Sequence, residues 1–181
     1  MKLSINDEAL LKTASALAMI CLAAALRIAP HPWNLAPVGA IALFSGAVLR
    51  NRWMALAFPL LALFAGDAFI GFHKLMPVVY ASFVVSVAIG MLLREKRTVP
   101  RVAMAILAGS VQFFIVTNFA VWTAFDAYPR TLAGLAACYA AGIPFFWNTL
   151  ASDALYSALL FGGLALAEKL LARTQPAAVR L

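Results

Sequence analysis

The sequence predicts an all-α integral membrane protein. Hydrophobic residues make up 65% and charged residues 12% of the 181 positions, and the mean hydropathy is +0.93. An average soluble domain is about half apolar and about a quarter charged. The net charge of +7 could suggest a nucleic-acid partner, but the basic residues lie in short clusters between apolar runs. That pattern is typical of the loops that flank membrane spans.

The apolar runs predict six transmembrane helices in a single domain, residues 1–181. We expect spans at about 9–28, 38–49, 53–72, 77–93, 102–124 and 148–171. A short outer helix is expected at about 131–141, separated from the last span by Gly142 and Pro144. At about 1.5 Å per residue, the second span barely crosses a hydrocarbon core of roughly 30 Å. Neighbouring helices or loop residues must therefore shield its ends.

The first apolar run also suits the core of a secretory signal. Asp7 and Glu8 interrupt the basic leader that such a signal needs, so we interpret the run as a span. Basic residues then orient the protein: with a cytoplasmic amino terminus, only Arg27, Lys74 and Arg130 of the 14 Lys and Arg residues face outwards. The positive-inside rule predicts that both termini are cytoplasmic, as in a multi-pass protein of the bacterial inner membrane.

Polar and aromatic residues gather on the predicted outer side. Asp67 lies in an apolar run about five residues before the outer end of its span. Asp153 lies five residues after the outer start of the last span, so both aspartates should lie at a similar depth in the membrane. An ionisable group inside a span is costly and therefore marks a candidate functional site. We predict an outward-facing ligand pocket. Its candidate residues are Arg27, His31, Trp33, Asn34, Asp67, His73, Asn118, Trp122, Tyr128, Tyr139, Trp147, Asn148, Asp153 and Tyr156.

Each candidate also has a structural interpretation. Asp67 and Asp153 could cap broken helices or pair with Arg27, and Asn118 could bond a neighbouring helix. The aromatic residues could form an interfacial belt. A belt would decorate both interfaces, however, and the inner side has nothing comparable except Trp53. This asymmetry favours a site, although helical spacing alone does not show that the two aspartates share one cavity.

Catalysis and resident metals are not favoured. The sequence contains no HExxH, GxSxG or phosphate-binding glycine-rich motif, so we predict that the protein is not an enzyme. His31 and His73 lie on different predicted loops without paired-ligand spacing, so no metal site is predicted. Small residues on the first span, Ala14 and Ala18, make a smooth helix face that suits either internal packing or a partner helix.

Four segments carry a family resemblance: PHPWNLAPVGAIALFSGA, GDAFIGFHKLMPVVYASF, VTNFAVW and YPRTLAGLAACYAAGIPFFWNTLASDALY. Together with six spans and an outer pocket, they resemble the substrate-binding S components of energy-coupling factor (ECF) vitamin transporters. They also look like an uncharacterised family of bacterial membrane proteins related to S components. Among S components, the solitary cobalamin transporter BtuM is the most similar in character.

The resemblance implies an S-component-like bundle that binds a vitamin-like molecule, with cobalamin or another corrinoid as the first candidate. It implies a transmembrane coupling subunit and ATPases as partners and no cofactor of its own. The cobalt-ligating cysteine expected soon after the third span is missing from residues 76–83, so cysteine-dependent cobalt chemistry is not carried over; Cys138 is an unsupported substitute. Two alternatives remain open: a self-sufficient proton-coupled secondary transporter, and a structural or assembly membrane protein without a small ligand.

Overall fold

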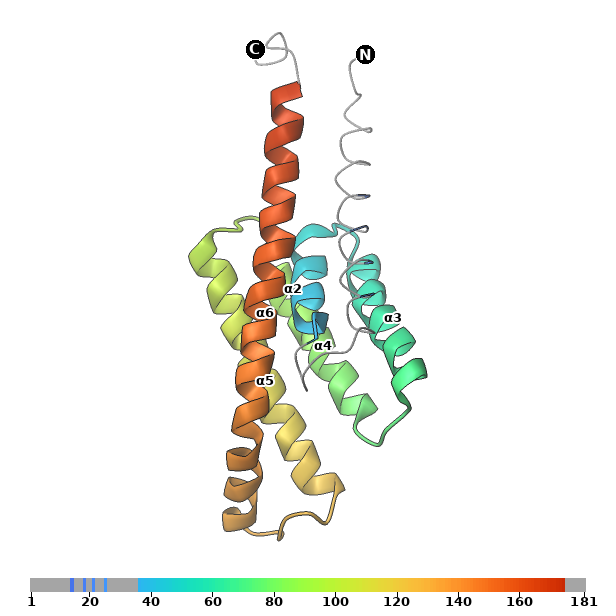
Figure 1. Cartoon of the computed structure of the whole chain (residues 1–181), viewed down its shortest axis with the longest axis vertical. Helices are drawn as coiled ribbons and strands as arrows, with labels where there is room; N and C mark the ends of the chain where they lie inside the picture. Colours follow the sequence, from blue (N-terminus) through green and yellow to red (C-terminus); the bar gives the residue numbers. More distant parts are fainter. Residues whose placement is uncertain (1–13, 15–17, 19–20, 22–24, 26–35, 175–181) are drawn as a thin grey trace.

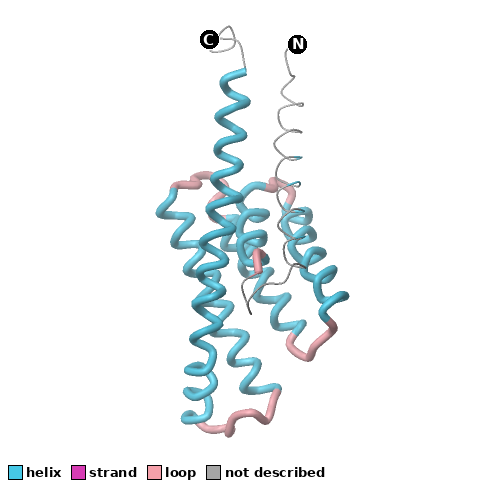
Figure 2. The backbone as a smooth tube through the Cα atoms, viewed as in Figure 1, coloured by secondary structure: helices cyan, strands magenta, loops and turns pink. Residues whose placement is uncertain are grey.

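The computed structural model describes residues 36–174 and four earlier helical positions, Ala14, Ala18, Cys21 and Ala25. Over 36–174 the only regular secondary structure is α-helix, with loops between the helices (Figures 1 and 2), which confirms the predicted all-α class for that part. The helices are α2 (Val38–Val48), α3 (Arg52–Ile70), α4 (Met76–Met91), α5 (Val99–Ala124) and α6 (Leu132–Thr174). The four earlier positions are exposed, and the rest of the predicted first span lies outside the described residues.

Local sequence signals explain where the helices begin and end. The side chain of Asn51 caps α3 by accepting a hydrogen bond from the backbone N–H of Trp53 at 2.8 Å. α3 ends at Gly71, whose φ of 108° is a conformation that side-chain-bearing residues rarely adopt. Proline occupies the first turn of both α4 and α5, where its missing N–H costs no helical hydrogen bond.

Three helices are long and apolar enough to cross a membrane: α3, α5 and α6. The other two, α2 with 11 residues and α4 with 16, are apolar but shorter. At about 1.5 Å per residue, α2 is only about 16 Å long. The structure thus supports the membrane-protein class, with three helices of spanning length among the described residues.

α6 corrects one prediction. We expected a short helix at 131–141 and a separate span from 148, but α6 runs without interruption from Leu132 to Thr174 and contains Pro144. An internal proline removes one hydrogen bond and crowds the carbonyl four residues earlier, yet it can bend a helix without ending it. Gly142 is also helical, because it packs against α5: a Cβ there would lie 2.9 Å from Cγ of Asn118.

α2 forms the centre of the bundle and contacts each of the other four helices. Nine of its residues are buried, as expected of a helix that is apolar on every side. It crosses α4 at two glycines, Gly46 and Gly90. A Cβ on Gly90 would lie 2.9 Å from the carbonyl carbon of Leu43, and one on Gly46 would lie 3.0 Å from the backbone nitrogen of Met91. The two backbones therefore touch directly, which only residues without a Cβ permit.

The bundle has two distinct ends (Figure 1). The connections 49–51 and 92–98 and the carboxyl end of α6 lie at one end, and the connections 71–75 and 125–131 lie at the other. We call the first the basic end, because its basic residues include Arg50, Arg52, Arg94, Lys96, Arg97, Arg101 and Lys169. The opposite end carries Lys74 and Arg130.

Candidate functional site

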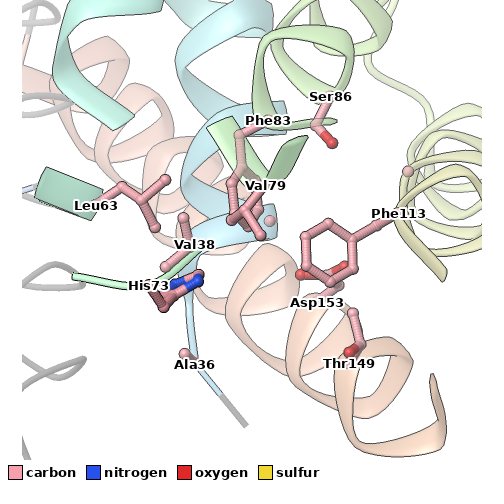
Figure 3. A pocket seen from close by; sticks show the side chains of 12 residues that line it. Ala36, Val38, Leu63, His73, Val79, Phe83, Ser86, Phe113, Thr149 and Asp153 are labelled. Carbon is pink, nitrogen blue, oxygen red and sulfur yellow. The ribbon is translucent and has the colours of Figure 1, made fainter. Parts of the chain in front are cut away.

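A cavity of about 250 Å³ lies where the five described helices meet. Its apolar wall includes Leu63 of α3, and Phe83 and Phe113, whose rings stack with centroids 5.2 Å apart. Polar groups reach it from His73 in the α3–α4 connection, Ser86 of α4, and Thr149 and Asp153 of α6, as Figure 3 shows. A mostly apolar cavity with a few convergent polar groups is the usual form of a small-molecule site.

Asp153 is the acidic group that lines this cavity. Its side chain is only 3% exposed, and Ser110 of α5 donates a hydrogen bond to its Oδ2 at 2.8 Å. The backbone N–H of Ala40, in the first turn of α2, is a second donor. α2 has no side-chain cap of its own, because its N-cap residue is Pro37. Asp153 therefore caps α2 from another helix, because its carboxyl group accepts a hydrogen bond from a backbone N–H that the helix cannot satisfy itself.

Gly39 makes this arrangement possible. Asp153 lies so close to α2 that a Cβ on Gly39 would be 2.7 Å from its Cγ. Next to it, Ser152 donates from Oγ to the carbonyl of Ala36 at 2.9 Å. Two consecutive residues of α6 thus hold the amino-terminal end of α2, and the Asp153 carboxylate lies at the boundary between this packing contact and the cavity.

A second cavity, of about 490 Å³, adjoins the first and shares Val79 and Phe113 with it. It lies between α4, α5 and α6 and is lined by Thr117, Asn118 and Tyr128. The amide nitrogen of Asn118 donates to the Phe114 carbonyl of its own helix at 2.8 Å. The two cavities are neighbours, and residues of the connections opposite the basic end line both: His73 lines the first and Tyr128 the second.

Four of the residues predicted for the site line these cavities: His73 and Asp153 line the first, and Asn118 and Tyr128 line the second. Asp67 lines neither. It is 3% exposed and accepts a hydrogen bond from the hydroxyl of Tyr80 at 2.9 Å. Its neighbour one turn earlier, Leu63, lines the first cavity, so Asp67 supports the wall from behind.

The remaining candidates contribute to packing or to the surface. Trp122 donates from Nε1 to the carbonyl of Pro129 at 2.9 Å, and Tyr139 donates from its hydroxyl to the carbonyl of Ile115 at 2.8 Å. Tyr156 packs against the main apolar core, whereas Trp147 is 60% exposed. Asn148 is half-buried on α6. Four predicted site residues lie outside the described residues: Arg27, His31, Trp33 and Asn34.

Several residues at the site were not predicted from the sequence. Ser110 and Gly39 surround Asp153, and Tyr80 bonds Asp67. Gln112 of α5 donates to the Ser82 carbonyl at 3.0 Å and to the Ser86 hydroxyl at 3.2 Å, next to the first cavity. Gln112 was visible as a polar residue within a span. Serine and glycine are common in membrane helices for packing alone, so their spacing gave no comparable signal.

Cavity and fold together define a class: an all-helical bundle with helices of membrane-spanning length and an internal cavity holding a buried carboxylate. The residues described here contain no cluster of three or more His, Cys, Asp or Glu side chains suited to a metal ion. The chain belongs to DUF6580, a family of unknown function whose model matches residues 8–177. No curated protein and no solved structure matches it significantly.

Proposed function

We propose that this protein is a membrane-embedded substrate-binding protein for the uptake of a vitamin-like small molecule. The observation that supports the proposal most strongly is the cavity beside Asp153. A buried carboxylate, a threonine hydroxyl and a histidine surround apolar space at a junction of five helices. Buried polar groups of this kind reject ligands that leave them unpaired, so they would supply selectivity.

Charge distribution supports an outward-facing site. The basic end carries most of the described Lys and Arg residues, and loops rich in these residues remain in the cytoplasm. The cavities lie towards the opposite end, so a ligand would enter from outside. We extend this orientation to the whole chain: six spans in an S-component-like arrangement, with both termini cytoplasmic, in a bacterial inner membrane.

Cavity size bears on the ligand. The second cavity, of about 490 Å³, falls in the range of roughly 300–1,000 Å³ that suits drug-sized molecules, and the first, of about 250 Å³, lies just below it. A corrinoid is far larger than such a molecule, so we now place a smaller vitamin-like compound ahead of cobalamin. Transport would need an energy source from outside the described chain, and an ECF-type coupling subunit with ATPases is our first candidate.

One substitution tests the cavity directly. Thr149 lines it, and its hydroxyl donates only to the Phe145 carbonyl of its own helix at 3.0 Å. Thr149→Phe should fill the space and reduce the retained small molecule at least about tenfold, as detected by mass spectrometry after denaturing the purified protein. Thr123→Phe is the matched control, because Thr123 donates to its own helix in the same way and lines neither cavity.

The outcomes separate the alternatives. A ligand that is retained by the unaltered protein and by Thr123→Phe, but lost in Thr149→Phe, supports the proposal. Equal retention in both variants would place the ligand elsewhere, and no ligand in any sample would favour a structural protein. Uptake that ceases when the proton gradient collapses while ATP is maintained would instead favour a proton-coupled transporter. A corrinoid would be recognised by its visible absorption.

A further inference from the structure

An apolar groove of about 460 Å³ runs between the carboxyl end of α4 and the amino end of α5. Small residues of α5, Ala105 and Ala108, line the groove, together with two larger and exposed residues, Leu92 directly after α4 and Met104 of α5. Leu92 is 77% exposed and Met104 66%. From Arg101 to Ala108 the groove extends about 10 Å along the helix, a length that accommodates part of an acyl chain.

One cation lines the groove at its end. Arg101 is exposed and stands two residues after the start of α5, at the basic end of the bundle. Within the residues described, Arg101 has no ion pair. An arginine at a helix end beside lipid-facing side chains lies at the depth of phospholipid headgroups.

The other charges of the α4–α5 connection show why Arg101 differs. Arg94 donates from Nε to the carbonyl of Gly46 and from Nη2 to that of Leu49, both at 2.9 Å. Arg97 pairs with Glu168 at 3.5 Å. Residues 94–101 hold four basic side chains and one glutamate, Glu95, a net charge of +3. Two of these cations already serve the fold, whereas Arg101 lines the groove and gives it a positive charge.

We propose that this groove binds an anionic phospholipid. An acyl chain would lie between α4 and α5 against the alanines, and the headgroup phosphate would accept hydrogen bonds from Arg101, with Lys96 nearby. Charge complementarity selects the occupant, because basic pockets at the membrane surface recognise anionic headgroups whereas a zwitterionic lipid gains little there. This site is separate from the cavity beside Asp153 and does not depend on the proposed function.

Native mass spectrometry of the full-length protein, titrated with dioleoyl phosphatidylglycerol or dioleoyl phosphatidylcholine, tests the proposal. These lipids share their acyl chains and differ in net charge. We expect preferential retention of phosphatidylglycerol and a loss of about fivefold in Arg101→Gln, the effect expected of one basic residue near an anionic headgroup. Arg130→Gln, at the opposite end, is the charge control and should retain the lipid.

A second pair of variants tests the groove itself. Ala108→Phe should fill the groove and reduce phosphatidylglycerol retention, whereas Ala103→Phe, an exposed position on the same helix outside the groove, should not. Equal retention of the two lipids, with no effect of Arg101→Gln, would overturn the proposal. An effect of Arg101→Gln without one of Ala108→Phe would show that the headgroup binds away from the groove, and would overturn the site as assigned. Circular dichroism and the thermal midpoint verify that each variant is folded.

Discussion

The two ends of α2 are held in opposite ways. Its amino end is capped by a carboxylate, Asp153 of α6, and opens onto the cavity. Its carboxyl end is capped by a guanidinium, Arg94, and is closed by the glycine crossing with α4. An acceptor thus meets the N–H groups at the amino end, and a donor meets the carbonyl groups at the carboxyl end. The closed end is packed backbone against backbone, whereas the open end relies on polar contacts that leave room for a ligand.

The two ends of α2 show how a short apolar helix is stabilised at the centre of a helical bundle. α2 is apolar on all sides and cannot satisfy its terminal N–H and C=O groups alone. Neighbouring segments provide the partners, so the fold of the centre depends on charges that come from distant parts of the sequence. The open end combines this structural role with a place at the candidate site.

The largest effect should come from the closed end. Gly90→Ala would place a Cβ against the Leu43 backbone, and overpacking of this kind costs about 3 kcal/mol because neither backbone can move freely. Unfolding in mixed detergent micelles measures the change. Gly162→Ala is the control: nothing lies within 4 Å of its Cβ, so it should be neutral or stabilise by about 0.5–1 kcal/mol. Similar stability of the two variants would contradict the close crossing.

A smaller loss should follow at the open end. Asp153→Asn keeps the size of the side chain but exchanges one acceptor oxygen for a donor, so either Ser110 or the Ala40 N–H loses its partner, and we expect destabilisation of about 2 kcal/mol. The same unfolding assay applies. Asp126→Asn, whose carboxylate is fully exposed near Arg130, should have no measurable effect. If Asp153→Asn is as stable as the unaltered protein, the carboxylate does not cap α2, and its role is confined to the cavity.

Arg94→Gln should have the smallest effect of the three. Arg94 donates two hydrogen bonds to α2, but its side chain is partly in solvent, so water can replace some of what is lost; we expect about 1 kcal/mol. Arg97→Gln is the comparison variant, because it breaks only a partly exposed ion pair. Arg97→Gln should therefore lower the thermal midpoint less than Arg94→Gln does. The reverse order would show that α2 does not depend on Arg94 at its carboxyl end.

The sequence located most helices to within a few residues, because apolar runs and the proline, glycine and asparagine signals at their ends are local. The expected span at 53–72, for example, is α3 at Arg52–Ile70. The sequence also marked Asp153, His73, Asn118 and Tyr128, which line the cavities. It failed at Pro144, where tertiary packing keeps a helix that local propensity would end, and it did not identify Tyr80 or Ser110 as partners.

Composition and charge pattern by themselves predicted an all-helical membrane protein with polar residues gathered towards one end, and the described residues are all-helical with three helices of spanning length. Only the tertiary structure decided that Asp67 bonds Tyr80 behind the wall while Asp153 stands at the cavity. The physical reason is that these helices are apolar around most of their circumference, so periodicity does not orient them. Close approach at Gly39, Gly46 and Gly90 sets their rotation, and that depends on which helices meet.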